Sequence, residues 1–423
     1  MSDYKFRFID LFCGIGGFHQ AMAQLGGKCV FACDINDMCR KVYAKNYKSE
    51  NDDLIIGSDI NKAIEEKIIP EFDVLCGGFP CQTFSKAGKR NGFKIVENEN
   101  GEKDERGQLF FRIIDILQEH PECKYVILEN VRNLADNEEN WKVVCDELKE
   151  QGFLMTEEPI VESPHNFGIP QVRDRVYILG IKKEFVKSDS VKNSGKITRE
   201  MLNIDGYYAK CPQNSIPLLL DKTTDDKYYV SEEITEILNI WEEFLQNVEN
   251  VKSPFWLHKA GLGIYDEEKY KKDETIGYAK MPEWKQKLVD KSRKMYMENH
   301  EFIDKWAKEH KMTEKSLIHQ KFEWNASKTC SSIKEGITQI RQSGVRVKNP
   351  DYFPSLVAMI NTPIVWDASA MKYRYLSPKE AAKLQSFRED FIFDESDPVS
   401  YRQLGNSVNV KLVKIFAEAL LKL

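Results

Sequence analysis

A cysteine that follows an apolar run is the first residue whose position suggests chemistry. Residues 73–76 are followed by Gly78-Phe79-Pro80-Cys81. A thiol just past a strand, held by a proline and preceded by glycines, is well placed to act as an exposed nucleophile. Burial as a structural side chain is an equally common fate for a free cysteine. The motif around Cys81 alone therefore leaves both interpretations open.

An acid and a pair of arginines stand at similar positions. Glu129 ends the apolar run 125–128, where its carboxylate could lie near Cys81 at one edge of a sheet. Arg173 and Arg175 alternate at the start of another apolar run, so both side chains can point to one face of an extended segment. Taken singly, a surface glutamate and a solvated arginine pair are the plain alternatives.

A glycine turn follows the first apolar run, residues 6–12, and opens a helical pattern. Its sequence is Gly14-Ile15-Gly16-Gly17, and glycines allow a backbone to approach a ligand closely. Asp34 ends the second apolar run, where an acid can accept hydrogen bonds from ribose hydroxyls. A dinucleotide fingerprint would need a third glycine at the position of His19. The pattern favours an adenosine-bearing cofactor without a pyrophosphate, and a purely structural turn is the alternative.

The elements that must position these residues alternate between strands and helices. The runs at 6–12, 28–34, 73–76, 125–129 and 175–181 are separated by helical patterns, for example at 109–119 and 141–150. This alternation predicts an α/β fold, with a mostly parallel, doubly wound sheet covered by helices on both faces.

The length of 423 residues predicts more than one domain. The strand–helix alternation stops after Lys183, and a helical pattern returns at 282–310 and again from Leu376. We therefore expect a catalytic, cofactor-binding domain at 1–184, a smaller second domain at 185–369, and a C-terminal segment at 370–423 that returns to the first domain.

Composition limits the partners of the chain. The net charge of −6 gives no global attraction to nucleic acid or membranes, so binding to a polyanion must come from local basic patches. No apolar run approaches the ~18 residues that span a bilayer, and no membrane contact is expected. The ten cysteines include no C-x-x-C, which favours reduced thiols in a cytoplasmic protein without a metal site.

In their order along the chain, these motifs closely resemble the DNA (cytosine-5) methyltransferase family of prokaryotic restriction–modification systems. The resemblance covers residues 6–182 and 373–423, and includes Arg402-Gln403-Leu404-Gly405-Asn406-Ser407-Val408. It implies an S-adenosylmethionine-dependent methyltransferase (Rossmann-like) fold, with residues 185–369 as an inserted target-recognition domain. The chain departs from the commonest family residues at four positions without losing a reacting group: Cys13, Thr83, Ser386 and Arg388.

The resemblance also implies residue roles. Cys81 would add to C6 of a flipped cytosine in duplex DNA, Glu129 would contact N3 and the exocyclic amine, and Arg175 would stabilise charge on O2 with Arg173 nearby. The implied S-adenosylmethionine-binding residues are Phe12, Gly14, Ile15, Gly16, Gly17, Asp34, Ile35, Asp59, Ile60, Phe79, Pro80, Leu109, Asn406, Ser407 and Val408. The candidate DNA-binding residues are Gln82, Ser85, Arg341, Arg346 and Lys348, of which the last three could equally form a solvated basic loop.

Two other functions remain open at this stage. An RNA (tRNA) cytosine-5 methyltransferase of the same fold usually carries a Cys-Phe-Thr tripeptide in the variable region, which this chain lacks. A catalytically inactive, DNA-binding relative would not be expected to retain Cys81, Glu129 and the arginine pair together. We expect a monomer that acts on double-stranded DNA in a bacterial or phage-infected cell. A cognate restriction endonuclease could belong to the same system, without a physical complex.

Overall fold

The computed structural model describes residues 4–80, 93, 96–97, 103–104, 106–222, 224–249, 251, 254–326, 329–356 and 362–423. The chain divides into two compact units. Unit 1 comprises Met1–Cys211, Pro354–Ile360 and Ala381–Leu423, and unit 2 comprises Pro212–Phe353 and Asn361–Glu380.

Unit 1 is built on an eight-stranded sheet in the order β3-β2-β1-β4-β7-β11-β8, with β9 also paired to β11. The strands are β1 (Phe6–Leu11), β2 (Gly27–Cys33), β3 (Ile55–Gly57), β4 (Val74–Gly77), β7 (Tyr125–Val131), β8 (Phe153–Met155), β9 (Ile160–Glu162) and β11 (Arg175–Lys182). The pairs from β3 to β7 are parallel, and only β11 runs antiparallel to its neighbours. The predicted α/β fold with a mostly parallel sheet is confirmed.

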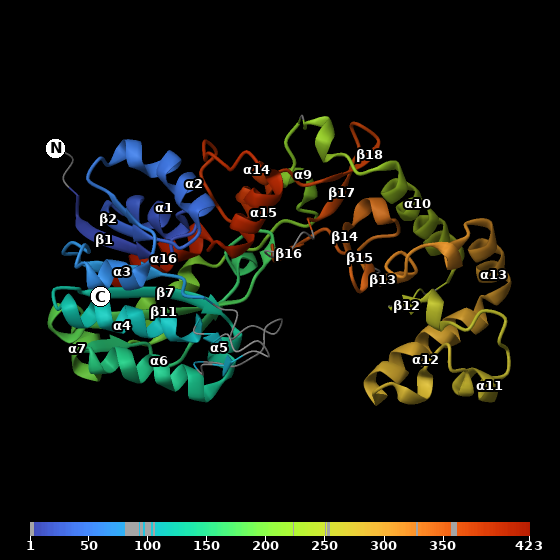
Figure 1. Ribbon diagram of the computed structural model, residues 1–423, viewed down its shortest axis with the longest axis horizontal. Coiled ribbons are helices and arrows are strands. Elements are labelled where there is room, and N and C mark those ends of the chain that lie inside the picture. The colour runs from blue at the N-terminus through green and yellow to red at the C-terminus, as the bar shows by residue number, and fades with distance from the viewer. Residues whose placement is uncertain are drawn as a thin grey trace. The chain divides into compact units, whose positions relative to one another are not determined.

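Helices cover this sheet because each carries an apolar face. In Figure 1, α1 and α2 are at the top of unit 1, and α4 and α6 are at the bottom. On α4, Phe110, Ile113 and Leu117 are buried at helical spacing, and they join the core of β1, β4 and β7. The helices are α1 (Gly17–Ala23), α2 (Asp37–Tyr47), α3 (Ile60–Glu65), α4 (Leu109–Glu119), α5 (Asn133–Asp136), α6 (Glu138–Glu150), α7 (Asp189–Ser194), α8 (Arg199–Leu202), α15 (Asp397–Asn406), α16 (Val410–Leu421) and α14 (Pro378–Leu384), which begins in unit 2. Three two-residue strands complete this part of the chain: β5 (Val96–Glu97), β6 (Lys103–Asp104) and β10 (Gln171–Val172).

Residues 185–211, which the sequence analysis grouped with the middle domain, pack with unit 1. Ile197 forms a parallel bridge with Thr156, directly after β8. The backbone N–H groups of Lys187 and Ser188 both donate to the Leu423 carbonyl at 2.5 Å. The strand–helix alternation therefore ends at Lys183, whereas the first compact unit continues as far as Cys211.

Unit 2 contains a six-stranded sheet in the order β12-β13-β15-β14-β17-β18. Its strands are β12 (Phe255–Trp256), β13 (Lys321–Asn325), β14 (Ile337–Arg341), β15 (Gly344–Lys348), β16 (Phe353–Pro354), which ends at the unit boundary, β17 (Ile364–Asp367) and β18 (Lys372–Tyr375). Its helices are α9 (Ile216–Leu219), α10 (Glu232–Asn247), α11 (Glu267–Lys272), α12 (Glu283–Glu298) and α13 (His300–Glu309). The rings of Trp241, Phe244, Trp306 and Phe322 pack together in its core, and those of Trp241 and Phe322 are stacked. The helical pattern predicted at 282–310 forms α12 and α13, separated at Asn299.

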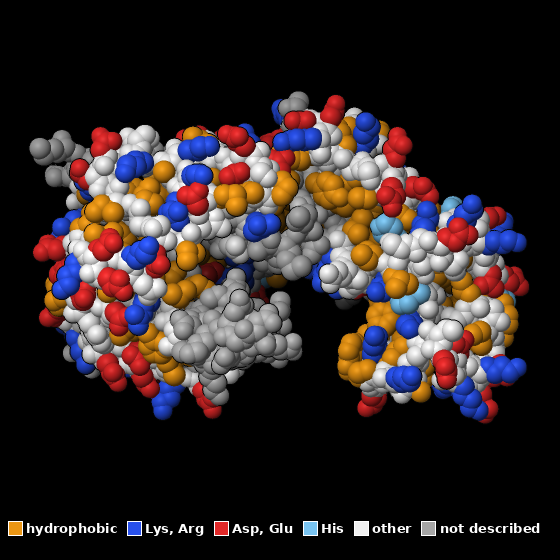
Figure 2. All heavy atoms as spheres, viewed as in Figure 1, with side chains coloured by type: hydrophobic (Ala, Val, Ile, Leu, Met, Phe, Trp, Pro, Cys, Tyr) orange, Lys and Arg blue, Asp and Glu red, His pale blue; other side chains and the backbone are white. Residues whose placement is uncertain are grey.

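On the face of the molecule drawn in Figure 2, acidic and basic side chains are interspersed over unit 1 without a large area of one sign. Among the helices formed by the described residues, none is both long and apolar enough to cross a membrane.

Candidate active site

The glycine turn after β1 is a strained backbone segment that only certain residues can form. Phe12, Gly14 and Gly16 have positive φ angles of 54°, 52° and 87°. A Cβ added to Gly16 would lie 2.2 Å from Cε2 of Tyr47, so a larger residue would collide with that ring. The turn therefore needs glycine for both its backbone angle and its close approach to α2.

Asp34 binds the glycine turn through its carboxylate. Oδ2 accepts a hydrogen bond from the Gly14 N–H at 2.8 Å, and Oδ1 accepts one from the Asn36 N–H at 2.8 Å. Burial raises the pKa of Asp34, and the two backbone N–H groups partly oppose that shift. The next residue, Ile35, is 81% exposed. At the ends of β1 and β2, the Asp34 carboxylate, which is fixed by hydrogen bonds, therefore lies next to the exposed apolar side chain of Ile35. This arrangement suits a nucleoside.

The turn between α15 and α16 packs against the glycine turn. A Cβ on Gly17 would lie 2.7 Å from Cγ2 of Val408 and 2.9 Å from Oγ of Ser407. Asn406 precedes them and is exposed. Two segments nearly 400 residues apart in sequence therefore meet at the expected cofactor position.

The other expected cofactor residues lie at or near the ends of neighbouring elements. Asp59 caps α3, and its Oδ1 accepts from the Asn61 N–H at 2.9 Å. Ile60 and Phe79 are buried, Pro80 is half-buried, and Leu109 packs partly into the core at the start of α4. Because Ile60 and Phe79 are buried, they can influence the site only by packing against its other residues, whereas the exposed Ile35 could contact a ligand directly.

Glu129 and Arg175 form an ion pair at the ends of adjacent strands. Glu129 on β7 pairs in register with Tyr177 on β11, so Arg175 is its diagonal neighbour on the same face. The Arg175 Nε lies 3.0 Å from the Glu129 Oε1. Glu129 is only 7% exposed, and burial raises its pKa although the charges of Arg175 and Arg173 lower it. A carboxyl group with a raised pKa can hold a proton and donate it to a bound base.

The segment that leads to Cys81 passes beside this acid. A Cβ on Gly78 would lie 3.9 Å from the Glu129 Oε2, and the Asn130 amide donates to the Phe79 carbonyl at 3.1 Å. The expected nucleophile, Cys81, and the candidate DNA-binding residues Gln82 and Ser85 lie outside the described residues.

Arg173 has a different environment from Arg175. It is 4% exposed, and its guanidinium donates to the carbonyls of Leu356 at 3.1 Å, Gly405 at 3.0 Å and Ser407 at 2.6 Å. These contacts anchor the turn before α16, which is the turn that packs on Gly17. Sequence reasoning paired Arg173 with Arg175 and could not find partners more than 180 residues away.

The buried rings of His19, Tyr43 and Tyr47 form a cluster next to the glycine turn, and the sequence analysis did not predict it. His19 stacks on Tyr47 with ring centroids 4.0 Å apart, and its Nδ1 lies 2.7 Å from the Tyr43 hydroxyl. Its backbone N–H donates to Asp10 Oδ2 at 3.2 Å. Burial lowers the pKa of His19 to about 3, so the ring is neutral at physiological pH. The only sequence signal was the spacing of Tyr43 and Tyr47, which places both on one side of α2.

The candidate DNA-binding residues Arg341, Arg346 and Lys348 share one face of the sheet in unit 2. Arg346 lies opposite Gln339 on β14 and opposite Glu323 on β13, and its Nε pairs with the Glu323 carboxylate. Burial lowers the pKa of Arg341 and of Lys348, and the charge of Arg346 adds to both effects. The opposite face holds Val345 and Val347, which belong to the core. We call these three cations the basic face of unit 2.

Comparison with known proteins gives a consistent result. The family model for C-5 cytosine-specific DNA methylase matches residues 6–422. Type II methyltransferase M.HpaII of Haemophilus parainfluenzae is 29% identical over 99% of this chain and 90% of its own length. Type II methyltransferase M.AluI of Cellulosimicrobium cellulans is 26% identical over 98% and 91%.

Solved structures share the fold. The crystal structure of S. pombe Dnmt2 methyltransferase superposes with a TM-score of 0.56 at 19% identity, covering 99% of both chains. A putative DNA modification methyltransferase encoded within an E. coli prophage superposes with a TM-score of 0.53 at 20% identity, covering 98% of this chain and 97% of its own.

Proposed function

This chain belongs to the C-5 cytosine-specific DNA methylase family and is a DNA (cytosine-5-)-methyltransferase of the restriction–modification type, and we propose that it uses S-adenosylmethionine to methylate a cytosine flipped out of duplex DNA. We further propose that the reaction passes through a covalent bond between Cys81 and C6 of the base. The observation that carries the proposal is the buried Glu129–Arg175 pair beside Gly78, three residues before the cysteine.

The chemistry explains why a thiol, an acid and a guanidinium are needed together. Cytosine C5 is a poor nucleophile because it belongs to an aromatic ring. Addition of the Cys81 thiolate to C6 forms a C–S bond and moves the ring electrons toward N3 and C5. Burial raises the pKa of Glu129, which favours its role as a proton donor to N3, and Arg175 can stabilise negative charge on O2. C5 then takes the methyl group and loses its proton to a base, the C–S bond breaks to release the thiolate, and N3 returns its proton to Glu129 as the aromatic ring is restored.

The cofactor would bind at the glycine turn. When bound, S-adenosylmethionine supplies the methyl group as an electrophile. The Asp34 carboxylate is available to ribose hydroxyls, the exposed Ile35 offers an apolar contact, and Gly14 to Gly17 leave room for the methionine part. The close contact between Gly17 and Val408 would close the pocket on the C-terminal side.

We assign Arg173 a positioning role. Its guanidinium contacts the carbonyls of Gly405 and Ser407, so it can hold the C-terminal side of the cofactor pocket while the adjacent Arg175 binds Glu129. One short extended segment would then link the cofactor side and the base side of the site.

We propose that unit 2 is the target-recognition domain and that its basic face contacts DNA. Three cations with one neighbouring acid, Glu323, leave excess positive charge on a chain whose net charge is negative. Arginine is well suited to guanine edges in the major groove and to phosphates.

The decisive experiment uses Cys81→Ala. The variant should lose methyl transfer to duplex DNA and retain affinity for DNA and cofactor, because only the nucleophile is removed. Wild-type protein with S-adenosylmethionine and duplex DNA carrying 5-fluorocytosine at the target should form a denaturant-stable adduct, since fluorine replaces the C5 proton whose loss would release the thiolate. Bisulfite sequencing of DNA from expressing cells would identify the site.

The matched control is Cys13→Ala, because Cys13 is the cysteine of the glycine turn and burial raises its thiol pKa well above the usual value. It should retain activity. An adduct in Cys81→Ala would contradict the covalent mechanism, and methylation of tRNA without methylation of duplex DNA would contradict the proposed substrate.

A further inference from the structure

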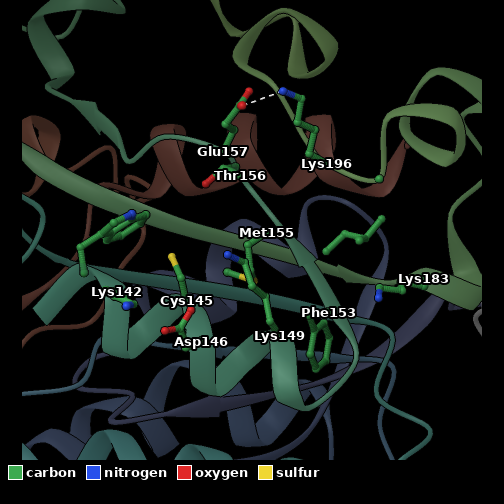
Figure 3. A pocket seen from close by; sticks show the side chains of 13 residues that line it. Lys142, Cys145, Asp146, Lys149, Phe153, Met155, Thr156, Glu157, Lys183 and Lys196 are labelled. Atoms are coloured by element: carbon green, nitrogen blue, oxygen red, sulfur yellow. Dashed lines mark hydrogen bonds and ion pairs between the residues drawn. The ribbon is translucent and has the colours of Figure 1, made fainter. Parts of the chain in front are cut away.

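A pocket lies in unit 1 at the edge of its sheet, and none of the candidate active-site residues lines it. Its volume is about 500 Å³, and it lies between α6, the edge strand β8 and the segment around Lys196 (Figure 3). This volume is within the range of pockets that hold small molecules.

The floor of the pocket is apolar. Phe153 and Met155 of β8 are buried, and Leu154 is half-buried between them. Trp141 and Cys145 of α6 line the same space. Burial raises the pKa of Cys145 to about 11, so this thiol stays protonated and serves as an apolar wall rather than as a nucleophile.

The rim of the pocket carries four lysines and two acids. Lys142, Asp146 and Lys149 come from successive turns of α6, and Lys183 follows β11 (Figure 3). The remaining two charges, Lys196 and Glu157, form an ion pair of 2.6 Å.

Three of these lysines have no acidic partner. Among the described residues, no ion pair is formed by Lys142, Lys149 or Lys183, although several other lysines of the chain pair with an acid one helical turn away. Asp146 and Glu157 offset part of this charge, but four lysines against two acids leave an excess of two positive charges around the pocket, a local potential that favours an anion.

A buried hydroxyl also lacks a partner at this site. Thr156 lines the pocket beneath Glu157, and its Oγ1 has no hydrogen-bond partner in the part of the chain that the structure describes. Buried hydroxyls are normally hydrogen-bonded, so a polar ligand atom next to Thr156 would remove an unfavourable feature of the structure.

We propose that this pocket binds an organic phosphate, with an apolar body on the β8 floor and phosphate oxygens on the lysine rim. Lysine binds phosphate as a point charge, which suits ammonium groups that approach from several elements. The apolar floor disfavours a bare inorganic anion, and the rim disfavours an uncharged molecule. The protein would therefore carry a second ligand site, separate from the cofactor and base sites.

Calorimetric titration of the full chain with ADP tests the proposal, with S-adenosylhomocysteine present at saturation to occupy the cofactor site. ADP should bind under these conditions, and adenosine and pyrophosphate should each bind at least tenfold more weakly, because each offers only half of the contacts. Absence of ADP binding, or its abolition by S-adenosylhomocysteine, would overturn the proposal.

Two variants should move the affinity in opposite directions. Lys142→Gln/Lys149→Gln should weaken ADP binding at least tenfold, because two rim charges are lost while helix propensity is nearly unchanged. Glu157→Gln should tighten binding severalfold, because it releases Lys196 from its ion pair.

The matched control is Lys45→Gln/Lys62→Gln, which removes two exposed lysines from α2 and α3 and should leave ADP affinity unchanged. Thermal unfolding would verify that each variant is folded. An equal loss of affinity in the control would show that ADP responds to overall charge and not to the pocket, which would also overturn the proposal.

Discussion

The strand ends of unit 1 and the basic face of unit 2 contain charged residues in opposite situations. At the strand ends each charge has a specific partner: Asp34 binds a backbone N–H and Glu129 binds Arg175. On the basic face, Arg341 and Lys348 lie near Arg346, and the charge of this arginine lowers the pKa of both.

This contrast separates two requirements. A reacting group must be held in position before the substrate arrives, and internal hydrogen bonds do that. A surface that binds DNA needs positive charges that the acidic side chains of the protein do not fully neutralise, because the DNA phosphates supply the negative charge. We therefore expect substitutions in unit 1 to change chemistry or folding, and substitutions on the basic face to change DNA affinity.

After removal of the Cys81 nucleophile, the largest expected effect is that of Glu129→Gln. Loss of the acid should lower kcat by roughly 10² to 10⁴-fold, the usual contribution of a general acid, with little change in DNA affinity. Because burial raises the pKa of Glu129, the wild-type acid stays protonated to higher pH than an exposed glutamate, and its contribution is lost as pH rises through that pKa. Single-turnover rates against pH would show this alkaline fall in wild type only. A large loss of DNA affinity instead would break the proposed division between the two regions.

Arg173→Ala should mainly reduce stability. It would leave the carbonyls of Leu356, Gly405 and Ser407 without this donor, and a buried acceptor that loses its partner costs about 1–3 kcal/mol. Denaturant unfolding would measure the change. Arg173→Lys should not restore stability, because an ammonium group cannot reach these acceptors as a planar guanidinium does. Full stability in Arg173→Ala would contradict the positioning role.

Asp34→Ala should weaken S-adenosylmethionine binding by about 10 to 100-fold, which corresponds to about 1.5–3 kcal/mol for a charge-assisted hydrogen bond. Asn406→Ala should also weaken it, and by less, because Asn406 is exposed and uncharged. Calorimetry with the cofactor alone checks both. Unchanged affinity in the two variants would remove the cofactor assignment at the glycine turn.

Arg341→Ala and Lys348→Gln test the basic face. Each should weaken duplex binding while kcat at saturating DNA stays unchanged. Loss of a phosphate contact would lower the slope of log affinity against log salt by about 1, whereas loss of a base contact would cost about 1–3 kcal/mol at one position of the site only.

Replacing unit 2 with that of a relative should transfer the DNA site. A folded chimera that still methylates the original site would contradict the recognition assignment.

The smallest expected effect belongs to a residue outside both regions. Ser386 has a φ angle of 58°, a left-handed conformation that glycine adopts without strain. Ser386→Gly should therefore raise the free energy of unfolding by about 0.5 kcal/mol, since relief of strain is partly offset by greater freedom of the unfolded chain. Thermal unfolding measures it, and kcat and DNA affinity should not change.

Much of unit 1 could be predicted from the sequence because its signals are local. Alternation of apolar runs and helical patterns predicted the sheet. The glycine turn and Asp34 were both predicted as cofactor-binding elements, but the hydrogen bond between Gly14 and Asp34 was not predicted. The family also followed from motif order, and the match over residues 6–422 confirms it. The roles of individual site residues, and the identity of Cys81 as nucleophile, stay predictions.

What only the tertiary structure decided involves residues far apart in the chain. Arg173 binds carbonyls at Gly405 and Ser407, Gly17 packs on Val408, and the lysine-rimmed pocket joins Lys142 with Lys196. A periodic sequence pattern indicates which face of one helix or strand is apolar, but it does not indicate which backbone carbonyls, far away in the chain, will need a hydrogen-bond donor. The hydrogen-bond partners of these groups are determined only when the chain folds, because each buried polar group must then form a hydrogen bond with a group that packs beside it.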